Sequence, residues 1–172
     1  QGHDVTVFEQ APELAPVGAG VLLQPSGQLV LEALGILDDV ARGSEQIDRI
    51  VARTDRGRVI LDLAYADGGS GLRGLGVARS TLHDALCART DRAGINVRVA
   101  TPIASHYGGD LIDSSGGRHG PFELVVAADG SASRLRAGSG LVRWSHEYAY
   151  GALWTVGQTS HVHGELRQVV HG

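Results

Sequence analysis

Apolar residues along the chain alternate between strand-like runs and helical spacing, a pattern that predicts a mixed α/β fold. Residues 5–8 are a β-branched and aromatic run without helical period, which is typical of a buried parallel strand. From Ser26 onward apolar residues recur at helical spacing, and we predict a helix that ends near Val40. Residues 47–53 and 58–64 flank a short Asp-Arg-Gly turn and therefore predict a β-hairpin.

The next segment predicts a loop, a helix and a strand in that order. Residues 67–76 are rich in glycine and predict the loop. Ser80 is in position to cap the helix and Gly94 is in position to stop it. Residues 95–99 then return to a strand-like pattern.

The chain from residue 103 onward carries short strand signals. Residues 103–107 and 111–114 are short segments of alternating side-chain type that are broken by the glycine pairs 108–109 and 116–117. This pattern predicts a small antiparallel meander. Residues 122–128 are almost wholly apolar and predict a central parallel strand that ends in a loop. Residues 150–156 and 166–170 are strand-like with a more aromatic character, and we expect them to begin a second sheet.

Composition restricts the class of protein. With 172 residues, 42% of them hydrophobic, the chain can bury one real core. Its net charge of -4 and scattered basic residues argue against nucleic acid as a partner. It has one cysteine, Cys87, no secretion signal and no apolar run of membrane-spanning length, so we predict a reducing, cytoplasmic location without a membrane partner. The chain lacks Met and opens at Gln1 directly before a strand, from which we expect that its gene starts further upstream.

Glu9 is the first residue with a chemical role to consider. It follows the predicted strand at the carboxyl edge, where open α/β sheets bind ligands and where an acidic residue binds ribose hydroxyls in dinucleotide folds. Alone, it is equally compatible with a solvated acid at a strand end. It would also fit a plain NAD-dependent dehydrogenase, against which the segment after Phe122 argues.

A second constellation follows the predicted strand 122–128 as the sequence D-G-x-x-S-x-x-R. Asp129 offers a carboxylate at the ligand end of the strand, and Gly130 lets the backbone pass close to a ligand. Ser133 can hold the loop and cap the next element, while Arg136 can pair with Asp129 or with a phosphate. The alternative is an ordinary capped turn between a strand and a helix.

Residues 123–136 resemble the second conserved motif of the p-hydroxybenzoate hydroxylase-like FAD-dependent monooxygenases, the class A flavoprotein aromatic hydroxylases. Three other stretches resemble the same family in order and spacing: residues 2–9 its second strand, residues 18–35 its G-A-G-[VI]…P…L..LG segment, and residues 77–82 its R-x-x-L helix start. The resemblance covers about residues 2–157. It lacks the family's amino-terminal glycine loop and its carboxyl-terminal G-D motif.

The resemblance implies a set of cofactor-binding residues. Glu9 would hold the adenosine ribose, Arg79 would contact FAD from a helix start, and backbone near Ile103 would touch the adenine. Gly18 to Val21 would run beside the flavin, and some family members carry an arginine where Gly18 stands. The full implied set is Glu9, Gln10, Gly18, Ala19, Gly20, Val21, Arg79, Ile103 and Asp129. The resemblance does not identify catalytic residues. For Arg79, the alternative to an FAD contact is a surface cation that anchors a neighbouring carboxylate.

The resemblance also implies the architecture and the reaction. Residues 1–143 would form a parallel-sheet FAD-binding domain of the glutathione-reductase-like Rossmann type with an antiparallel meander. Residues 144–172 would begin a substrate-binding sheet interleaved with residues 45–75. The expected activity is FAD-dependent hydroxylation of an aromatic or similar small organic substrate with NAD(P)H and O2. Oligomeric state is not readable from the sequence.

Other interpretations stay open at the level of sequence. The fold also serves flavin epoxidases, halogenases and reductases, and a truncated, non-catalytic nucleotide-binding fragment is a further alternative. Four aromatic residues fit either an aromatic substrate wall or ordinary sheet packing: Trp144, Tyr148, Tyr150 and Trp154. His161 and His163 would share one face of a strand, but two ligands do not make a metal site, and we predict none.

Overall fold

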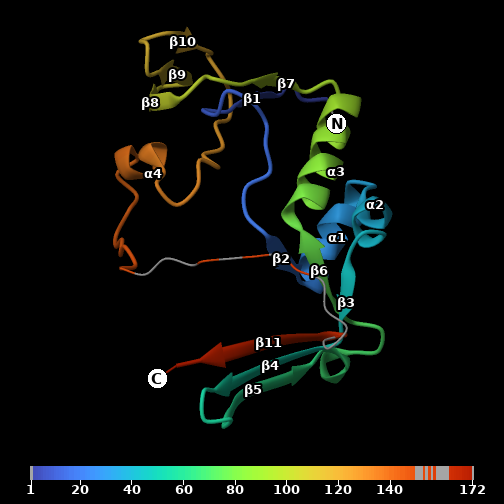
Figure 1. The fold of residues 1–172 in the computed structure, drawn as a ribbon. Helices are drawn as coiled ribbons and strands as arrows, with labels where there is room; N and C mark the ends of the chain where they lie inside the picture. Colours follow the sequence, from blue (N-terminus) through green and yellow to red (C-terminus); the bar gives the residue numbers. More distant parts are fainter. Residues whose placement is uncertain (1, 150–152, 154, 156, 158–162, 172) are drawn as a thin grey trace. The chain divides into compact units, whose positions relative to one another are not determined.

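The computed structural model describes residues 2–149, 153, 155, 157 and 163–171, and the chain divides into two compact units (Figure 1). Unit 1 comprises Gln1–Leu14 and Gly94–Ala152, and unit 2 comprises Ala15–Ala93 and Leu153–Gly172. Each unit contains at least one helix together with parallel and antiparallel strand pairs. The predicted mixed α/β class is therefore confirmed, while the Rossmann arrangement and the predicted domain boundaries stay predictions.

The parallel part of unit 1 is a pair of short strands. Strand β1 (Thr6–Phe8) pairs in parallel with β7 (Asn96–Arg98), as the sequence predicts. The predicted burial of the first strand is wrong, because Val5 and Val7 are each 42% exposed. Among the described residues β1 has one neighbouring strand, so one edge of it is uncovered.

The predicted meander of unit 1 is confirmed. Its strands are β8 (Ile103–Tyr107), β9 (Asp110–Asp113) and β10 (Arg118–His119), and all pairings are antiparallel with β9 in the centre. Leu111 on β9 is buried. The meander follows β7 directly along the chain, which places it in the same unit as the parallel pair.

The central strand predicted over residues 122–128 is absent from the structure. These residues have no strand assignment, and Leu124 and Val126 are 79% and 76% exposed. A strand requires a neighbour to receive its backbone hydrogen bonds. Among the described residues no strand pairs with this segment, so its apolar sequence alone does not make it a strand.

The single helix predicted from Ser26 to Val40 is wrong, because the structure divides it into two. Helix α1 (Pro25–Ala33) is followed by Gly35, which has a φ of +70°, and α2 (Leu37–Ala41) begins beyond this glycine. The amides of Gly35 and Ile36 donate back to carbonyl oxygens of the last turn of α1 at 2.8 and 3.0 Å. This paired hydrogen bonding around a left-handed glycine is a Schellman motif, which terminates a helix.

Helix α3 (Arg79–Arg92) confirms the second predicted helix but not its predicted cap. The helix begins at Arg79 with Ala78 as the N-cap residue, and no side chain caps it. Ser80 therefore lies inside the first turn. Gly94, with a φ of +68°, follows the last residues of the helix as predicted.

Unit 2 contains a sheet in which β6 (Gly74–Ala78) lies between β2 (Gly20–Leu23) and β3 (Glu45–Ile47), all antiparallel. The end of the loop predicted over residues 67–76 is thus a strand. Its glycines conceal the strand pattern, yet they fit the packing, because a Cβ atom at Gly74 would lie 2.8 Å from the Tyr65 hydroxyl. A short 3₁₀ helix (Tyr65–Gly68) precedes the strand.

The main hydrophobic core of unit 2 lies between this sheet and its helices. It consists of five buried side chains from α1, β6 and the start and middle of α2: Leu31, Ile36, Val40, Leu75 and Val77. Partly buried Leu82 and Ala85 of α3 pack against it. The core therefore fixes β6 and α3, the two elements that meet at Arg79.

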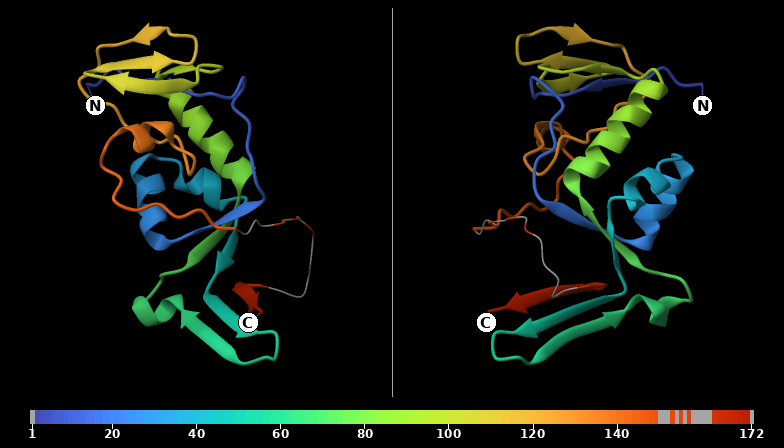
Figure 2. Two further views of the ribbon diagram at one scale, coloured as in Figure 1. Left: turned by 90° about the vertical axis from the view of Figure 1, so that its left-hand side faces the viewer. Right: turned by 45° about the vertical axis from the view of Figure 1, so that its right-hand side comes forward.

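A second sheet of unit 2 has β4 (Arg49–Thr54) in its centre, antiparallel to β5 (Val59–Ala64) and parallel to β11 (Glu165–Val170) (Figure 2). The predicted hairpin and the predicted strand at 166–170 are both confirmed. Across the hairpin, Arg49 Nε donates to Asp62 Oδ1 at 2.6 Å, and this hydrogen bond lowers the pKa of Asp62.

Two predictions concern segments that the structure describes only in part. The strand predicted over residues 150–156 lies mostly outside the described residues, as does His161. Within the described part of the chain, no helix has both the length and the apolar character needed to cross a membrane.

Candidate functional site

The residues of the predicted glycine segment and the predicted arginine come together in unit 2. Strand β2 pairs with β6 so that Gly20 lies opposite Ala78 and Val21 opposite Val77. The amide of Arg79 donates to the carbonyl oxygen of Ala19 at 3.2 Å. Residues about sixty positions apart in the sequence thus share one strand end.

The Arg79 side chain lies against Gly18. A Cβ atom at Gly18 would be 2.8 Å from Arg79 Cδ and 3.0 Å from its Nε. Gly18 also has a φ of +101°, which a residue with a side chain rarely adopts. Arg79 is exposed at the first turn of α3, whose backbone amides have no side-chain cap. This strand end therefore presents a cation and helix-terminal amides, a combination that favours anions.

Glu9 and Gln10 follow β1 in unit 1. One carboxylate oxygen of Glu9 accepts a hydrogen bond from the amide of Ala11 at 2.7 Å. The backbone of Glu9 bonds to Arg98 at 2.9 Å and to Thr101 at 2.8 Å. These bonds bring the chain just before Ile103, the first residue of β8, alongside Glu9. Gln10 is exposed at the turn.

Asp129 is held by the loop that follows it, as the D-G-x-x-S-x-x-R sequence suggested. Ser133 Oγ donates to Asp129 Oδ1 at 2.5 Å, and the Leu135 amide lies 3.4 Å from its other carboxylate oxygen. The hydrogen bond from Ser133 is the main cause that lowers the pKa of Asp129 below its usual range. Asp129 is therefore ionised at neutral pH and can only accept hydrogen bonds.

The same loop confirms the predicted role of Ser133 and changes that of Arg136. Ser133 is the N-cap of α4 (Arg134–Gly138), and its Oγ accepts from the Arg136 amide at 2.9 Å. The Arg136 guanidinium donates to the carbonyl oxygens of Gly130 and Ser131 rather than to Asp129. Arg136 thus stabilises the backbone of the loop, and the side-chain partner of the Asp129 carboxylate is Ser133.

A cavity of about 1020 Å³ borders this loop within unit 1. Asp129, Ser133 and Arg136 form a polar part of its lining, and Val125, Leu141 and Trp144 are among its apolar lining residues. Trp144 is 80% exposed and lies in no strand, so sheet packing does not explain it. The lining thus combines apolar side chains with polar and charged ones.

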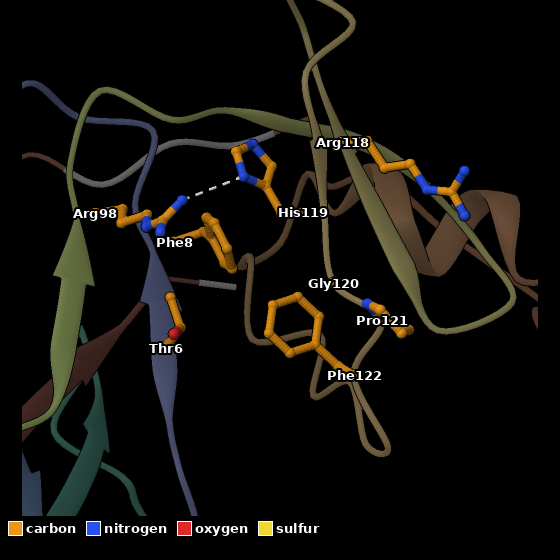
Figure 3. Close-up of a pocket in the computed structure, with 8 residues that line it drawn as sticks. All are labelled: Thr6, Phe8, Arg98, Arg118, His119, Gly120, Pro121 and Phe122. Carbon is orange, nitrogen blue, oxygen red and sulfur yellow. Dashed lines mark hydrogen bonds between the residues drawn. The ribbon is translucent and has the colours of Figure 1, made fainter.

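Sequence reasoning missed a second, smaller cavity of about 350 Å³ in unit 1 (Figure 3). Phe8 on β1 is its centre: the His119 ring lies 5.0 Å away, the Phe122 ring 6.0 Å away, and the Arg98 guanidinium 5.8 Å above the Phe8 ring. The residues come from three separate segments, so no spacing in the sequence signals them.

Two residues that line this smaller cavity, Arg98 and His119, belong to a hydrogen-bonded group that also includes Asp113. His119 Nε2 bonds to Asp113 Oδ2 at 2.8 Å, and Arg98 Nη1 lies 3.3 Å from His119 Nδ1. Because the guanidinium can only donate, Nδ1 of His119 is the acceptor in the contact with Arg98, and Nε2 donates to the Asp113 carboxylate. Hydrogen bonds from Ser115, first, and His119 lower the pKa of Asp113 well below its usual range. The cluster contains no nucleophile, and we interpret it as a stabilising network.

Cys87 lies on α3 near His83, with Sγ 3.6 Å from the imidazole Nε2. Burial raises the pKa of the Cys87 thiol, so the thiol stays protonated at neutral pH. The pair therefore lacks the thiolate that nucleophilic catalysis requires.

Comparison with known proteins gives relatives that are named as a quinolone synthase and as a monooxygenase. The probable 2-heptyl-3-hydroxy-4(1H)-quinolone synthase AqdB2 of Rhodococcus erythropolis is 29% identical over 136 residues, 79% of this chain and 35% of that protein. The 3-amino-4-hydroxybenzoate 2-monooxygenase of Streptomyces cremeus is 29% identical over 154 residues, 87% of this chain and 39% of that protein. No protein-family model matches the chain.

The fold is also similar to that of solved oxygenase structures. The tetrameric form of 2-methyl-3-hydroxypyridine-5-carboxylic acid oxygenase has a TM-score of 0.70 and 32% identity, over 81% of this chain and 36% of that one. The chain thus spans between a third and two fifths of the relatives named here. Over about 80% of its residues, the chain is homologous to the FAD-dependent aromatic monooxygenases, the family that its motifs resemble.

Proposed function

We propose that this chain is the cofactor-holding part of an FAD-dependent monooxygenase that uses NAD(P)H and O2 to hydroxylate an aromatic or similar small organic substrate. The observation that carries the proposal is Asp129, an ionised carboxylate fixed by Ser133 on the wall of a cavity of about 1020 Å³. The printed names of three relatives contain a quinolone, a hydroxybenzoate and a hydroxypyridine carboxylic acid, which supports an aromatic substrate.

The residues present fit the polar groups of FAD. Glu9 uses one carboxylate oxygen on Ala11, and among the described residues of unit 1 no hydrogen bond engages the other. That oxygen can accept a ribose hydroxyl. Arg79 offers an exposed guanidinium at an uncapped helix start, which suits a phosphate. Gly18, which has no side chain, leaves the space in which the Arg79 stem lies.

When bound, FAD supplies the redox chemistry of the reaction. The chain binds and orients it. Arg79 neutralises phosphate charge, and Glu9, with backbone near Ile103, fixes the adenosine end. Ionised Asp129 accepts hydrogen bonds from hydroxyl or amide donors and repels phosphate, so it restricts which part of the cofactor can lie against it. Gln10 and the backbone from Gly18 to Val21 complete the proposed cofactor contacts.

The finer architecture is part of the same proposal. The parallel pair β1–β7 with its following meander supports a glutathione-reductase-like Rossmann arrangement for the FAD-binding domain. The pairing of β11 with β4 supports the proposed substrate-sheet domain, because it joins residues 144–172 to residues 45–75. The domain boundary at residue 143 belongs to this proposal as well.

The direct test is titration of the purified chain with FAD, followed by the visible spectrum and by quenching of flavin fluorescence. We expect saturable binding that Asp129→Asn weakens, because the amide keeps the size of the side chain but replaces one of its accepting oxygens with a donor. Asp4→Asn is the matched control, since Asp4 is an exposed carboxylate of the same unit with no hydrogen-bond partner among the described residues. A folded, colourless chain without FAD affinity contradicts the proposal.

A further inference from the structure

Gly18 and Arg79 form a close contact whose geometry depends on the missing side chain at position 18. The stem of Arg79 fills the volume that a Cβ atom would occupy, with distances of 2.8 Å to Cδ and 3.0 Å to Nε. Real Cβ atoms do not approach other atoms this closely. Arg79 therefore keeps its observed orientation only while residue 18 is glycine.

The backbones on both sides of this contact cannot move apart easily. Arg79 follows β6, whose Val77 is 2% exposed and belongs to the core of unit 2. The Arg79 amide bonds to Ala19, the residue next to Gly18, and the β2–β6 ladder continues from Gly20. An added side chain at position 18 must consequently displace the flexible Arg79 stem rather than the strands.

We propose that Gly18 is a positioning residue for Arg79: it gives the guanidinium its place beside β2, and a side chain there turns the cation away from the cofactor phosphates. This inference rests on the proposed function, in which Arg79 binds FAD.

A second role of Gly18 has to be separated from this one. Its φ of +101° strains any residue with a side chain, whatever its neighbours. Gly57 provides the control, because it has a φ of +84° in the same unit and a Cβ atom there would meet no atom within 4 Å. Gly57→Ala carries the backbone strain alone, whereas Gly18→Ala carries the strain and the collision.

The test combines two measurements on the full chain. In ¹⁵N NMR spectra without ligand, Gly18→Ala is expected to shift the Nε–H signal of Arg79, and Gly57→Ala to leave it in place. In FAD titrations, Gly18→Ala and Arg79→Ala are expected to lower affinity by the same factor, about tenfold, the equivalent of ~1.4 kcal/mol. The double variant should be no weaker than Arg79→Ala alone, because both changes remove one contact.

Each result has a defined meaning. An unshifted Arg79 signal in Gly18→Ala overturns the positioning role, and so does a further loss of affinity in the double variant. Failure of the wild-type chain to bind FAD contradicts the proposed function instead, and the ligand-free NMR comparison then decides the positioning role by itself.

Discussion

The two regions proposed to hold the cofactor are fixed in different ways. Arg79 in unit 2 follows a strand whose side chains belong to a hydrophobic core, and its own stem is packed on Gly18. Asp129 in unit 1 follows a segment with exposed apolar side chains, and hydrogen bonds within its own loop hold it. Binding groups can thus be oriented by packing beneath them or by a local polar network, and the two kinds should respond to different changes.

The largest effect is expected where packing supports the site. Ile36 is 1% exposed in the core of unit 2, and Ile36→Ala should lower the free energy of unfolding by about 2–5 kcal/mol. Urea denaturation measures the loss. Leu29→Ala is the control on the neighbouring helix, where 65% exposure predicts a change within about 0.5 kcal/mol. Equal losses of unfolding free energy for the two variants would contradict the view that core packing supports this part of unit 2.

A smaller effect is expected in the Asp129 loop. Ser133→Ala removes the N-cap of α4 and should cost about 1 kcal/mol of local stability. It should also raise the pKa of Asp129 toward its ordinary value, because the main hydrogen bond that lowers it is lost. A ¹³C NMR titration of the carboxyl group measures this. Ser133→Thr keeps the hydroxyl and should keep the pKa of Asp129 low. An Asp129 pKa that is the same in wild type and in both variants would contradict the view that the Ser133 hydrogen bond lowers it.

The smallest expected effect depends on pH and concerns the meander of unit 1. The folded-state pKa of Asp113 is lowered, so its carboxylate contributes stability above the unfolded-state pKa of about 3.9 and loses it as pH falls toward the folded-state value. The stability difference between wild type and Asp113→Asn should therefore be full at neutral pH and shrink below about pH 4. Asp4→Asn, an exposed control, should show no such window in denaturation curves recorded across this range.

The sequence predicted elements well where local signals were sufficient. The turn at Gly57, the stop at Gly94 and the meander are determined by short stretches, and all three are present. Residues 5–8 and 122–128 show the limit, since both are apolar runs but just the first has a neighbouring strand among the described residues. Pairing is a property of two segments, and one segment alone cannot reveal it.

The candidate site shows the same limit at the level of side chains. The role of Ser133 as a cap was predictable, because capping acts over three residues. The partner of Arg136 was not, since two nearby carbonyl oxygens compete with the Asp129 carboxylate for it. The contact of Gly18 with Arg79 depends on the β2–β6 pairing, and no local pattern contains it. Strand β6 itself was hidden by the glycines that its packing requires.

The pairing of β2 with β6 has a consequence for the order of folding. It joins segments about fifty to sixty residues apart, and the closure of such a large loop has an entropic cost that must be met before the new contacts stabilise it. The strand end that carries Gly18 and Arg79 is thus a product of late, non-local folding, while the hairpin β4–β5 inside the same loop can form early. Acquisition of cofactor affinity would therefore report completed folding of unit 2, rather than the first appearance of its helices.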